Sequence, residues 1–147
     1  MNSLIPHPEG GSYCEIYRGA ELVQCNAGLR NTATVIYFRL RAGERSRFHR
    51  LRHDELWFWH EGATVTVHTI NEAGHHAELV CGPPNMGGEY CVLIRAGVWF
   101  GALPNGNDVL VSAVVAPGFE FADFDLAEQA DLMALYPQHA HLICLLT

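Results

Sequence analysis

The chain has 147 residues, the length of one ordinary domain, and 49% of them are apolar, so a core can form without disulfides or metals. A formal net charge of −7 argues against nucleic acid as a partner, because contact with phosphates needs a basic face. No apolar run approaches the ~20 residues of a membrane span, and residues 1–10 lack the basic cluster and apolar stretch of a secretory signal. We therefore expect a cytoplasmic protein with one domain over residues 1–147 and no membrane contact.

In chain order, residues 7–11 contain Pro and two Gly residues and are expected to form a turn. Segments rich in β-branched and aromatic residues then predict short strands separated by Gly and Pro turns. These strands are expected at residues 12–18, 34–40, 53–60, 63–70, 77–81, 90–95 and 109–116. Only the end is typical of a helix, where Asp125 can cap residues 126–135 and Pro137 can stop them. This order predicts an all-β antiparallel sandwich or barrel with a short C-terminal helix.

The cysteines and arginines give weaker signals. The five cysteines are odd in number and form no CxxC pair, which argues against a disulfide framework and a structural zinc site. All nine cationic residues are arginine, and six of them lie between Arg39 and Arg52. These arginines are either solvated and paired with acidic residues, or one or two of them enter a pocket and bind an anion bidentately.

The strand predicted over 53–60 combines several chemical groups on one face. Alternation places His53, Glu55, Trp57 and Trp59 on the same side. Aromatic walls with a few orienting polar groups are typical of a ligand cavity. Burial among indoles would raise the pKa of Glu55, which suits a general acid or base near neutral pH.

The spacing of Gly43, His49, Glu55 and Gly62 resembles the first conserved motif of the cupins. That motif has a second histidine two residues after the first, where this chain has Leu51. His53 is the nearby candidate to replace it. In the stretch that corresponds to the second cupin motif, Gly97 is retained, but Arg95 stands in place of proline and Phe100 in place of a metal-binding histidine.

The resemblance extends along the whole chain to the short single-domain cupins catalogued as the fifth cupin type, a domain of unknown function. The matching segments are residues 6–11, 37–38, 46–50, 54–57, 96–99, 115–124 and 143–147. The resemblance implies a double-stranded β-helix, or jelly roll, that pairs as a homodimer with its N-terminal strand crossing to the partner. His53, Arg39 and Arg95 depart from the family pattern, which indicates a member specialised for its own ligand.

Our first hypothesis is a metal-independent enzyme of the isomerase, epimerase, cyclase or lyase type, acting on a small polar or anionic substrate without a cofactor. His49 or Glu55 would be the base, and Tyr37 or His53 the proton partner. Arg39 shares a face with Val35 and Tyr37 on the strand 34–40, and either Arg39 or Arg95 would clamp the substrate's negative charge. The expected substrate-binding set is Arg39, Trp57, Trp59, Arg95, Trp99 and His68.

Two other hypotheses belong to different classes. In a metal-dependent oxygenase or lyase, His49, His53 and Glu55 would hold a divalent metal as a two-histidine, one-carboxylate set, with His68 as a fourth ligand. In a non-catalytic binding or sensing protein, the same pocket would bind a small molecule without turnover.

Overall fold

The computed structural model describes residues 3–147, so the first two residues of the N-terminal segment considered above lie outside it. Residues 3–147 form thirteen strands: β1 Ile5–Pro6, β2 Ser12–Arg18, β3 Leu22–Cys25, β4 Gly28–Asn31, β5 Thr34–Leu40, β6 Ser46–Leu51, β7 Asp54–Gly62, β8 Val65–Ile70, β9 His76–Cys81, β10 Cys91–Ile94, β11 Trp99–Pro104, β12 Val109–Ala116 and β13 Phe124–Leu126. The helices are α1 Gln129–Leu135 and α2 Ala140–Leu146, with the 3-10 turns η1 Pro84–Met86, η2 Phe121–Asp123 and η3 Pro137–His139.

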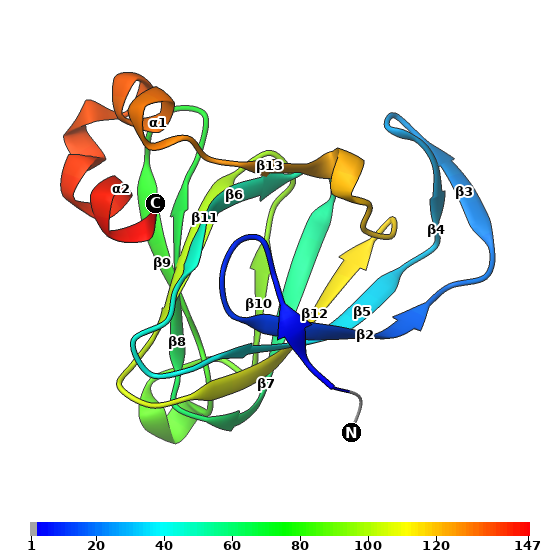
Figure 1. The fold of residues 1–147 in the computed structure, drawn as a ribbon, viewed down its shortest axis with the longest axis horizontal. Helices are drawn as coiled ribbons and strands as arrows, with labels where there is room; N and C mark the ends of the chain where they lie inside the picture. Colours follow the sequence, from blue (N-terminus) through cyan, green and yellow to red (C-terminus); the bar gives the residue numbers. More distant parts are fainter. Residues whose placement is uncertain (1–2) are drawn as a thin grey trace.

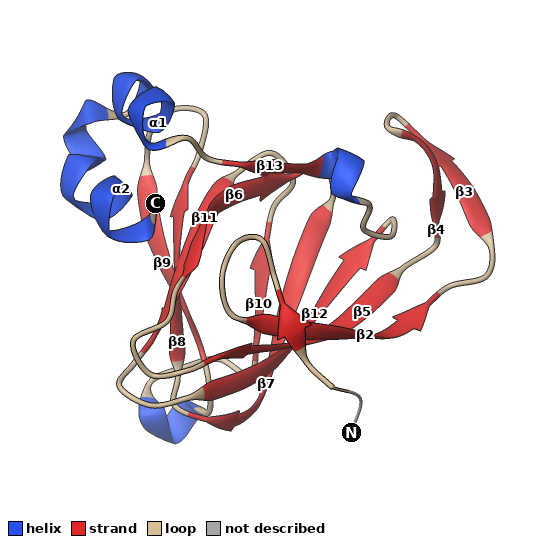
Figure 2. Ribbon diagram, in the orientation of Figure 1, coloured by secondary structure: helices blue, strands red, loops and turns tan. Residues whose placement is uncertain are grey.

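The strands assemble into two large antiparallel sheets and one hairpin (Figures 1 and 2). The first sheet has the order β1-β2-β5-β12-β7-β10, and the second has the order β13-β6-β11-β8-β9. The hairpin β3–β4 projects from the side of the barrel beside β5 (Figure 1). Neighbours that are far apart in sequence, such as β12 between β5 and β7, make the fold depend on long-range pairing.

The core lies between the two large sheets because alternate residues of each strand face inward. Phe38 and Leu40 from β5 meet Trp57 from β7 and Val65 and Val67 from β8, and all five are buried. Full burial of such a side chain contributes about 1.5–3 kcal/mol. Because Phe38 and Leu40 face inward, Arg39 between them faces outward.

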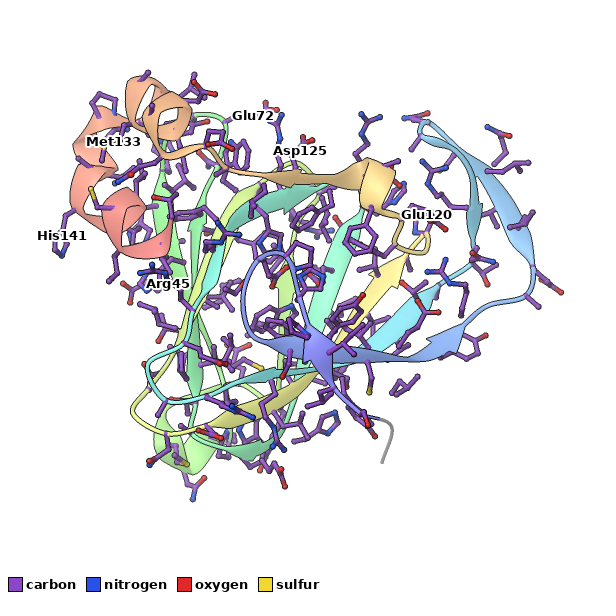
Figure 3. The ribbon with its side chains drawn as sticks, in the orientation of Figure 1. Arg45, Glu72, Glu120, Asp125, Met133 and His141 are labelled. Carbon is purple, nitrogen blue, oxygen red and sulfur yellow. The ribbon has the colours of Figure 1, made fainter. Side chains whose placement is uncertain are left out.

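A second apolar cluster joins the helices to the outer face of the five-stranded sheet. Phe48 and Ile70 of that sheet pack against Leu132 of α1 and Ile143 and Leu146 of α2. Arg45 extends toward α2 and donates to the Leu145 carbonyl oxygen at 3.0 Å (Figure 3). Within residues 3–147, no helix is long and apolar enough to cross a bilayer.

The expected all-β barrel with a short helical C-terminus is confirmed, and β2, β5 and β12 have the predicted bounds. The predicted helix over 126–135 was too long, because Leu126 ends β13 and α1 begins only at Gln129. A further helix, α2, follows Pro137. Residue patterns also failed to predict β6, because its arginines mask the alternation, and β11, because it contains a glycine and a proline.

Candidate functional site

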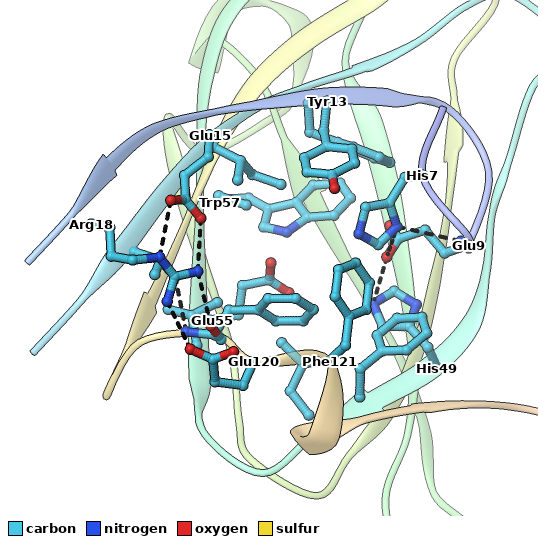
Figure 4. Close-up of a pocket in the computed structure, with 18 residues that line it drawn as sticks. His7, Glu9, Tyr13, Glu15, Arg18, His49, Glu55, Trp57, Glu120 and Phe121 are labelled. Carbon is cyan, nitrogen blue, oxygen red and sulfur yellow. Dashed lines mark hydrogen bonds and ion pairs between the residues drawn. The ribbon is translucent and has the colours of Figure 1, made fainter. Parts of the chain in front are cut away.

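A cavity of about 90 Å³ lies on the inner face of the six-stranded sheet (Figure 4). It is closed by β6, by the loop between β1 and β2, and by the segment 119–124. This volume is enough for several water-sized groups, since one water needs roughly 10–15 Å³ on the same measure. Its walls include six aromatic residues: Tyr13, Phe38, Trp57, Phe119, Phe121 and Phe124.

The loop between β1 and β2 carries two ionisable residues into this cavity. Gly10 and Gly11 both have positive φ, at 111° and 64°, which other residues rarely adopt. A Cβ atom on Gly10 would collide with the carbonyl oxygen of Arg45, so the loop can pack this closely only with glycine there. The Arg47 N–H then donates to the Glu9 carbonyl oxygen at 2.8 Å. As a result the Glu9 side chain points inward and is buried.

Glu9 is the centre of a buried polar cluster. Ser46 Oγ donates to Glu9 Oε1 at 2.6 Å. Glu9 Oε2 lies 3.3 Å from His49 Nε2 and 3.2 Å from His7 Nδ1. His49 Nδ1 lies 2.7 Å from the Arg47 carbonyl oxygen, which can only accept, so Nδ1 carries a proton. The nitrogen of His49 that exchanges protons is therefore Nε2, which faces the carboxylate.

Glu9 and His49 titrate as a coupled pair, in which each charge stabilises the other and burial opposes both. Burial alone would raise the pKa of Glu9, but His49, His7 and Ser46 together hold it below its ordinary value. Burial lowers the pKa of His49, although Glu9 and the Arg47 carbonyl oppose that change. A proton that arrives at His49 Nε2 would be held against the Glu9 carboxylate, which makes this pair a proton acceptor.

Glu55 lies on β7 and faces the same cavity. Burial raises its pKa to about 8, and the negative charge of Glu9 adds to this rise. The Trp57 indole opposes the rise, although its N–H is not placed to form a hydrogen bond with the carboxylate. Glu55 is therefore a neutral carboxylic acid at pH 7, and it can donate a proton or a hydrogen bond.

Two polar atoms in this part of the cavity have no hydrogen-bond partner among residues 3–147. They are Glu55 Oε2 and Trp57 Nε1, both buried. An unsatisfied buried polar group costs about 1–3 kcal/mol, and natural structures retain few of them. These two unpartnered atoms come from residues that lie two apart on β7. They indicate a position where the polar atoms of a ligand would bind.

Arg18 closes the side of the cavity as part of a charged cluster (Figure 4). Its guanidinium donates to Glu15 at 2.8 and 3.0 Å, to Glu120 at 2.9 Å and to Asn31 at 2.9 Å. The hydrogen bonds that it donates to Glu15 contribute most to its raised pKa. Through these bonds Arg18 links β2 to the segment 119–124. Because two carboxylates already neutralise its charge, it does not present a free cation to a ligand.

Of the predicted site residues, the structure brings His49, Glu55 and Trp57 together at the cavity. The expectation that Tyr37 and Arg39 face inward is wrong. Residues 36, 38 and 40 fill the inner face of β5, so the alternate residues face outward. Tyr37 packs edge-on against the His60 ring at 5.6 Å, and Arg39 lies 3.4 Å from Glu61.

His53 is also outside the cavity, because it lies in the bend before β7 and does not continue the alternation of that strand. Its Nε2 lies 3.5 Å from Cys25 Sγ on the hairpin, and its Nδ1 lies 3.9 Å from Asp123. It therefore cannot be the proton partner of a ligand bound beside Glu55 without moving.

The other four expected binding residues lie elsewhere on the barrel. Arg95 pairs with Asp54 at 2.9 Å on the outer face of β7. The remaining three residues each have a local partner: Trp59 donates to the Ala63 carbonyl oxygen at 3.0 Å, Trp99 stacks under the Arg50 guanidinium at 4.6 Å, and His68 contacts His76 on the outer face of β8.

The expected metal set does not fit this cavity. Within residues 3–147, the ligand atoms of His49, His53 and Glu55 do not all lie within 4.8 Å of one another. Leu51 lines the cavity where a second histidine would be needed, and the Phe100 ring packs 4.0 Å from the His49 ring. The proposed two-histidine, one-carboxylate arrangement is therefore wrong in its residues.

Glu9, His7 and Arg18 line the cavity but were not among the predicted site residues, although the sequence left open that the segment 7–11 packs near the pocket mouth. The segment 7–11 was expected to be a turn, and its Gly pair was the available signal that the chain approaches another strand closely. Arg18 gave no signal, because its partner Glu120 is about a hundred residues away in sequence.

Several proteins of known structure share this architecture. A hypothetical protein from Leishmania major is 32% identical, with a TM-score of 0.92 over 98% of this chain and 93% of its own. A protein from Shewanella oneidensis is 37% identical, with a TM-score of 0.91 over 98% and 90% of the two chains. KdgF from Halomonas has the same fold at 13% identity, with a TM-score of 0.57 over 82% and 91%. No curated protein matches the chain.

The family described as "Cupin superfamily (DUF985)" matches residues 2–127. This span includes every strand and the whole cavity lining, and it confirms the resemblance noted in the sequence. The chain therefore belongs to the DUF985 family of the cupin superfamily.

Proposed function

We propose that this protein is a metal-independent acid–base enzyme that acts on a small polar substrate in the barrel cavity. The buried pair of an unprotonated His49 and an ionised Glu9 would accept a proton. The neutral carboxylic acid of Glu55 would donate one. Isomerisation, epimerisation, cyclisation and β-elimination all need one group of each kind held in a site that excludes water.

The observation that carries this proposal is the different environment of two carboxyl groups in one cavity. Glu9 has three polar partners, which lower its pKa, whereas burial raises the pKa of Glu55 to about 8. Two titratable groups whose pKa values are pushed apart by their surroundings are typical of an acid and a base in an active site. The unpartnered Trp57 N–H would bind an oxygen atom of the substrate beside Glu55.

The charges around the cavity favour an uncharged substrate over an anionic one. Arg18 is already paired with Glu15 and Glu120, and Arg39 and Arg95 lie on the outside of the barrel. An anion would therefore meet the Glu9 charge without a free cation to balance it. A small hydroxy-aldehyde or hydroxy-ketone offers an acidic C–H bond and a carbonyl oxygen without a net charge.

The test is solvent deuterium incorporation, followed by proton NMR in D₂O, with a panel of small aldoses, ketoses, keto acids and hydroxy acids. The protein should exchange a carbon-bound proton next to the carbonyl group of at least one uncharged compound. Glu55→Gln and His49→Ala should each lower that rate by about 10²–10⁴-fold, the usual contribution of a general acid or base. His75→Ala, on an exposed turn, is the matched control and should not change it.

Full activity in Glu55→Gln would contradict the assignment of the acid. The competing hypothesis, a binding or sensing protein, predicts a compound that raises the melting temperature without any deuterium incorporation. If every compound that binds raised the melting temperature without deuterium incorporation, a binding or sensing function would be favoured.

We further propose that two copies pair through the N-terminal strands, as the family resemblance implies. Ile5, Ile16 and Tyr17 on β1 and β2 and Leu22 and Leu29 on the hairpin are each at least 43% exposed, which leaves large apolar side chains on these strands uncovered. Light scattering should give twice the mass of the 16.3 kDa chain. A double change of Ile16 and Tyr17 to aspartate should give the monomer mass, and a monomeric unmodified protein would contradict the proposal.

A further inference from the structure

A second cluster of histidine and glutamate side chains lies on the outer face of the five-stranded sheet, away from the cavity. His68 of β8 stands directly opposite Glu78 of β9 in the antiparallel register. His76 lies two residues before Glu78 and therefore projects from the same face of β9. His68 Nδ1 is 3.2 Å from His76 Nε2 and 3.5 Å from Glu78 Oε1.

We propose that His68, His76 and Glu78 form a binding site for a divalent transition-metal ion of the zinc type. All three ligand atoms lie within 4.8 Å of one another. In a tetrahedral zinc site with bonds of about 2.0–2.1 Å, ligand atoms are roughly 3.3 Å apart. The distances of 3.2 and 3.5 Å from His68 Nδ1 already match that separation.

The donor set suits this class of ion. Two imidazoles and one carboxylate are ligands that zinc, copper and nickel share, whereas magnesium and calcium prefer oxygen atoms alone. Three protein ligands leave one coordination position open to water. The site is accessible from solvent because the Glu78 side chain is 55% exposed, and it is separate from the cavity because none of its three residues lines it.

Hydrogen bonding alone accounts for this cluster less well. A single proton on His68 Nδ1 can be directed at His76 or at Glu78, but not at both. Both of these atoms nevertheless approach the same nitrogen. A metal ion satisfies all three at once. His139 packs 5.7 Å from the His76 ring, and its Nε2 is 2.8 Å from the Gly74 carbonyl oxygen, so it borders the site without joining it.

The experiment is calorimetric titration of the full untagged chain, stripped with EDTA, with Zn²⁺ at pH 7.5. We expect one Zn²⁺ per chain and a rise in melting temperature, since the ion binds the folded state. His68→Ala and His76→Ala should each weaken binding by about 100-fold or more, and Glu78→Gln by less, because loss of one of three ligands removes much of the site. His75→Ala changes the exposed residue just before β9. It is the matched control and should bind Zn²⁺ as the unmodified protein does.

Absence of Zn²⁺ binding, or one-to-one binding that survives in a His68→Ala, His76→Ala double variant, would overturn the proposal. Circular dichroism of each variant should show that the strands remain formed. Co²⁺ gives a second measurement, because a tetrahedral site with nitrogen and oxygen ligands produces visible absorption bands that the double variant should lack. Glu55→Gln should bind Zn²⁺ unchanged, so this test is independent of the acid–base proposal.

Discussion

The protein contains two groups of two histidines and one glutamate, and they differ in where the fold places them. His7, Glu9 and His49 lie inside the barrel, and Glu9 is only 6% exposed. The other three, His68, His76 and Glu78, lie on the outer face of β8 and β9. In the buried group, Ser46 and a carbonyl oxygen occupy further hydrogen-bonding positions, whereas the ligand atoms of the outer group lie within 4.8 Å of one another.

The difference shows how burial changes the chemistry available to the same residue types. In the cavity, desolvation and a fixed neighbouring charge move the pKa values of His49 and Glu9 away from their ordinary ranges, which suits proton transfer. At the surface, water can reach the ligands and a metal ion can enter. The two groups should therefore respond differently to pH, to truncation and to zinc.

The largest expected effect concerns Glu55, the neutral acid beside the buried group. The folded state keeps its proton up to pH about 8, whereas the unfolded state loses it near the ordinary value of 4.5. The free energy of unfolding should therefore fall as pH rises through this window and level off above it. The difference in unfolding free energy between the unmodified protein and Glu55→Gln isolates this contribution, which amounts to at most about 5 kcal/mol.

Urea denaturation from pH 4.5 to 9 measures that difference. Glu55→Gln should gain stability relative to the unmodified protein as pH rises, because glutamine has no proton to lose. A difference that stays constant across this range would mean that Glu55 titrates at the same pH in both states, and would remove the basis for its role as the acid.

Truncation of the two glutamates separates the clusters more directly. Glu9→Ala removes the partner of Ser46 and His49 and should cost about 3 kcal/mol, as for other buried polar networks that lose one member. Glu78→Ala, in metal-free buffer, should change stability by less than about 0.5 kcal/mol, since exposed pairs contribute little. Equal losses in urea denaturation would contradict the distinction between the two groups.

The loop that carries Glu9 inward gives a smaller effect. Gly10→Ala places a Cβ against the Arg45 carbonyl oxygen at a positive φ and should cost about 2 kcal/mol. Gly43→Ala is the matched control, with φ 81° and nothing near its Cβ, and should cost about 1 kcal/mol. If Gly43→Ala proved the more costly in thermal unfolding, close packing of the loop would not be what positions Glu9.

The smallest effect is expected for the arginines outside the barrel. Arg39→Ala and Arg95→Ala break exposed ion pairs with Glu61 and Asp54 and should each change stability by less than about 0.5 kcal/mol. Neither variant should alter deuterium incorporation. Loss of activity in either variant would indicate that the arginine binds the negative charge of the substrate.

The sequence predicted the fold well because alternation and turn residues are local signals. Val109–Ala116 is nearly continuous in apolar residues, and the structure makes it the central strand β12, paired on both sides. The same reasoning placed Glu55 and Trp57 on one inner face, which the cavity lining confirms.

The remaining errors come from signals that are ambiguous or nonlocal. Val35 and Tyr37 make the face of β5 that carries Arg39 partly apolar, so alternation did not exclude an inward Arg39. His53 was treated as part of a strand that begins one residue later. Glu9 reaches His49 only because a loop far away in sequence folds over β6, and no periodic pattern encodes that contact.

The proposed acid–base function depends on a protonated Glu55 beside an ionised Glu9 in the cavity. The most direct measurement is a carbon-13 NMR titration of the side-chain carboxyl groups in glutamate-labelled protein, with the Glu55 signal assigned through Glu55→Gln. We expect a Glu55 midpoint near pH 8 and a Glu9 midpoint below its ordinary value. A Glu55 midpoint near its ordinary value of 4.5 would contradict it.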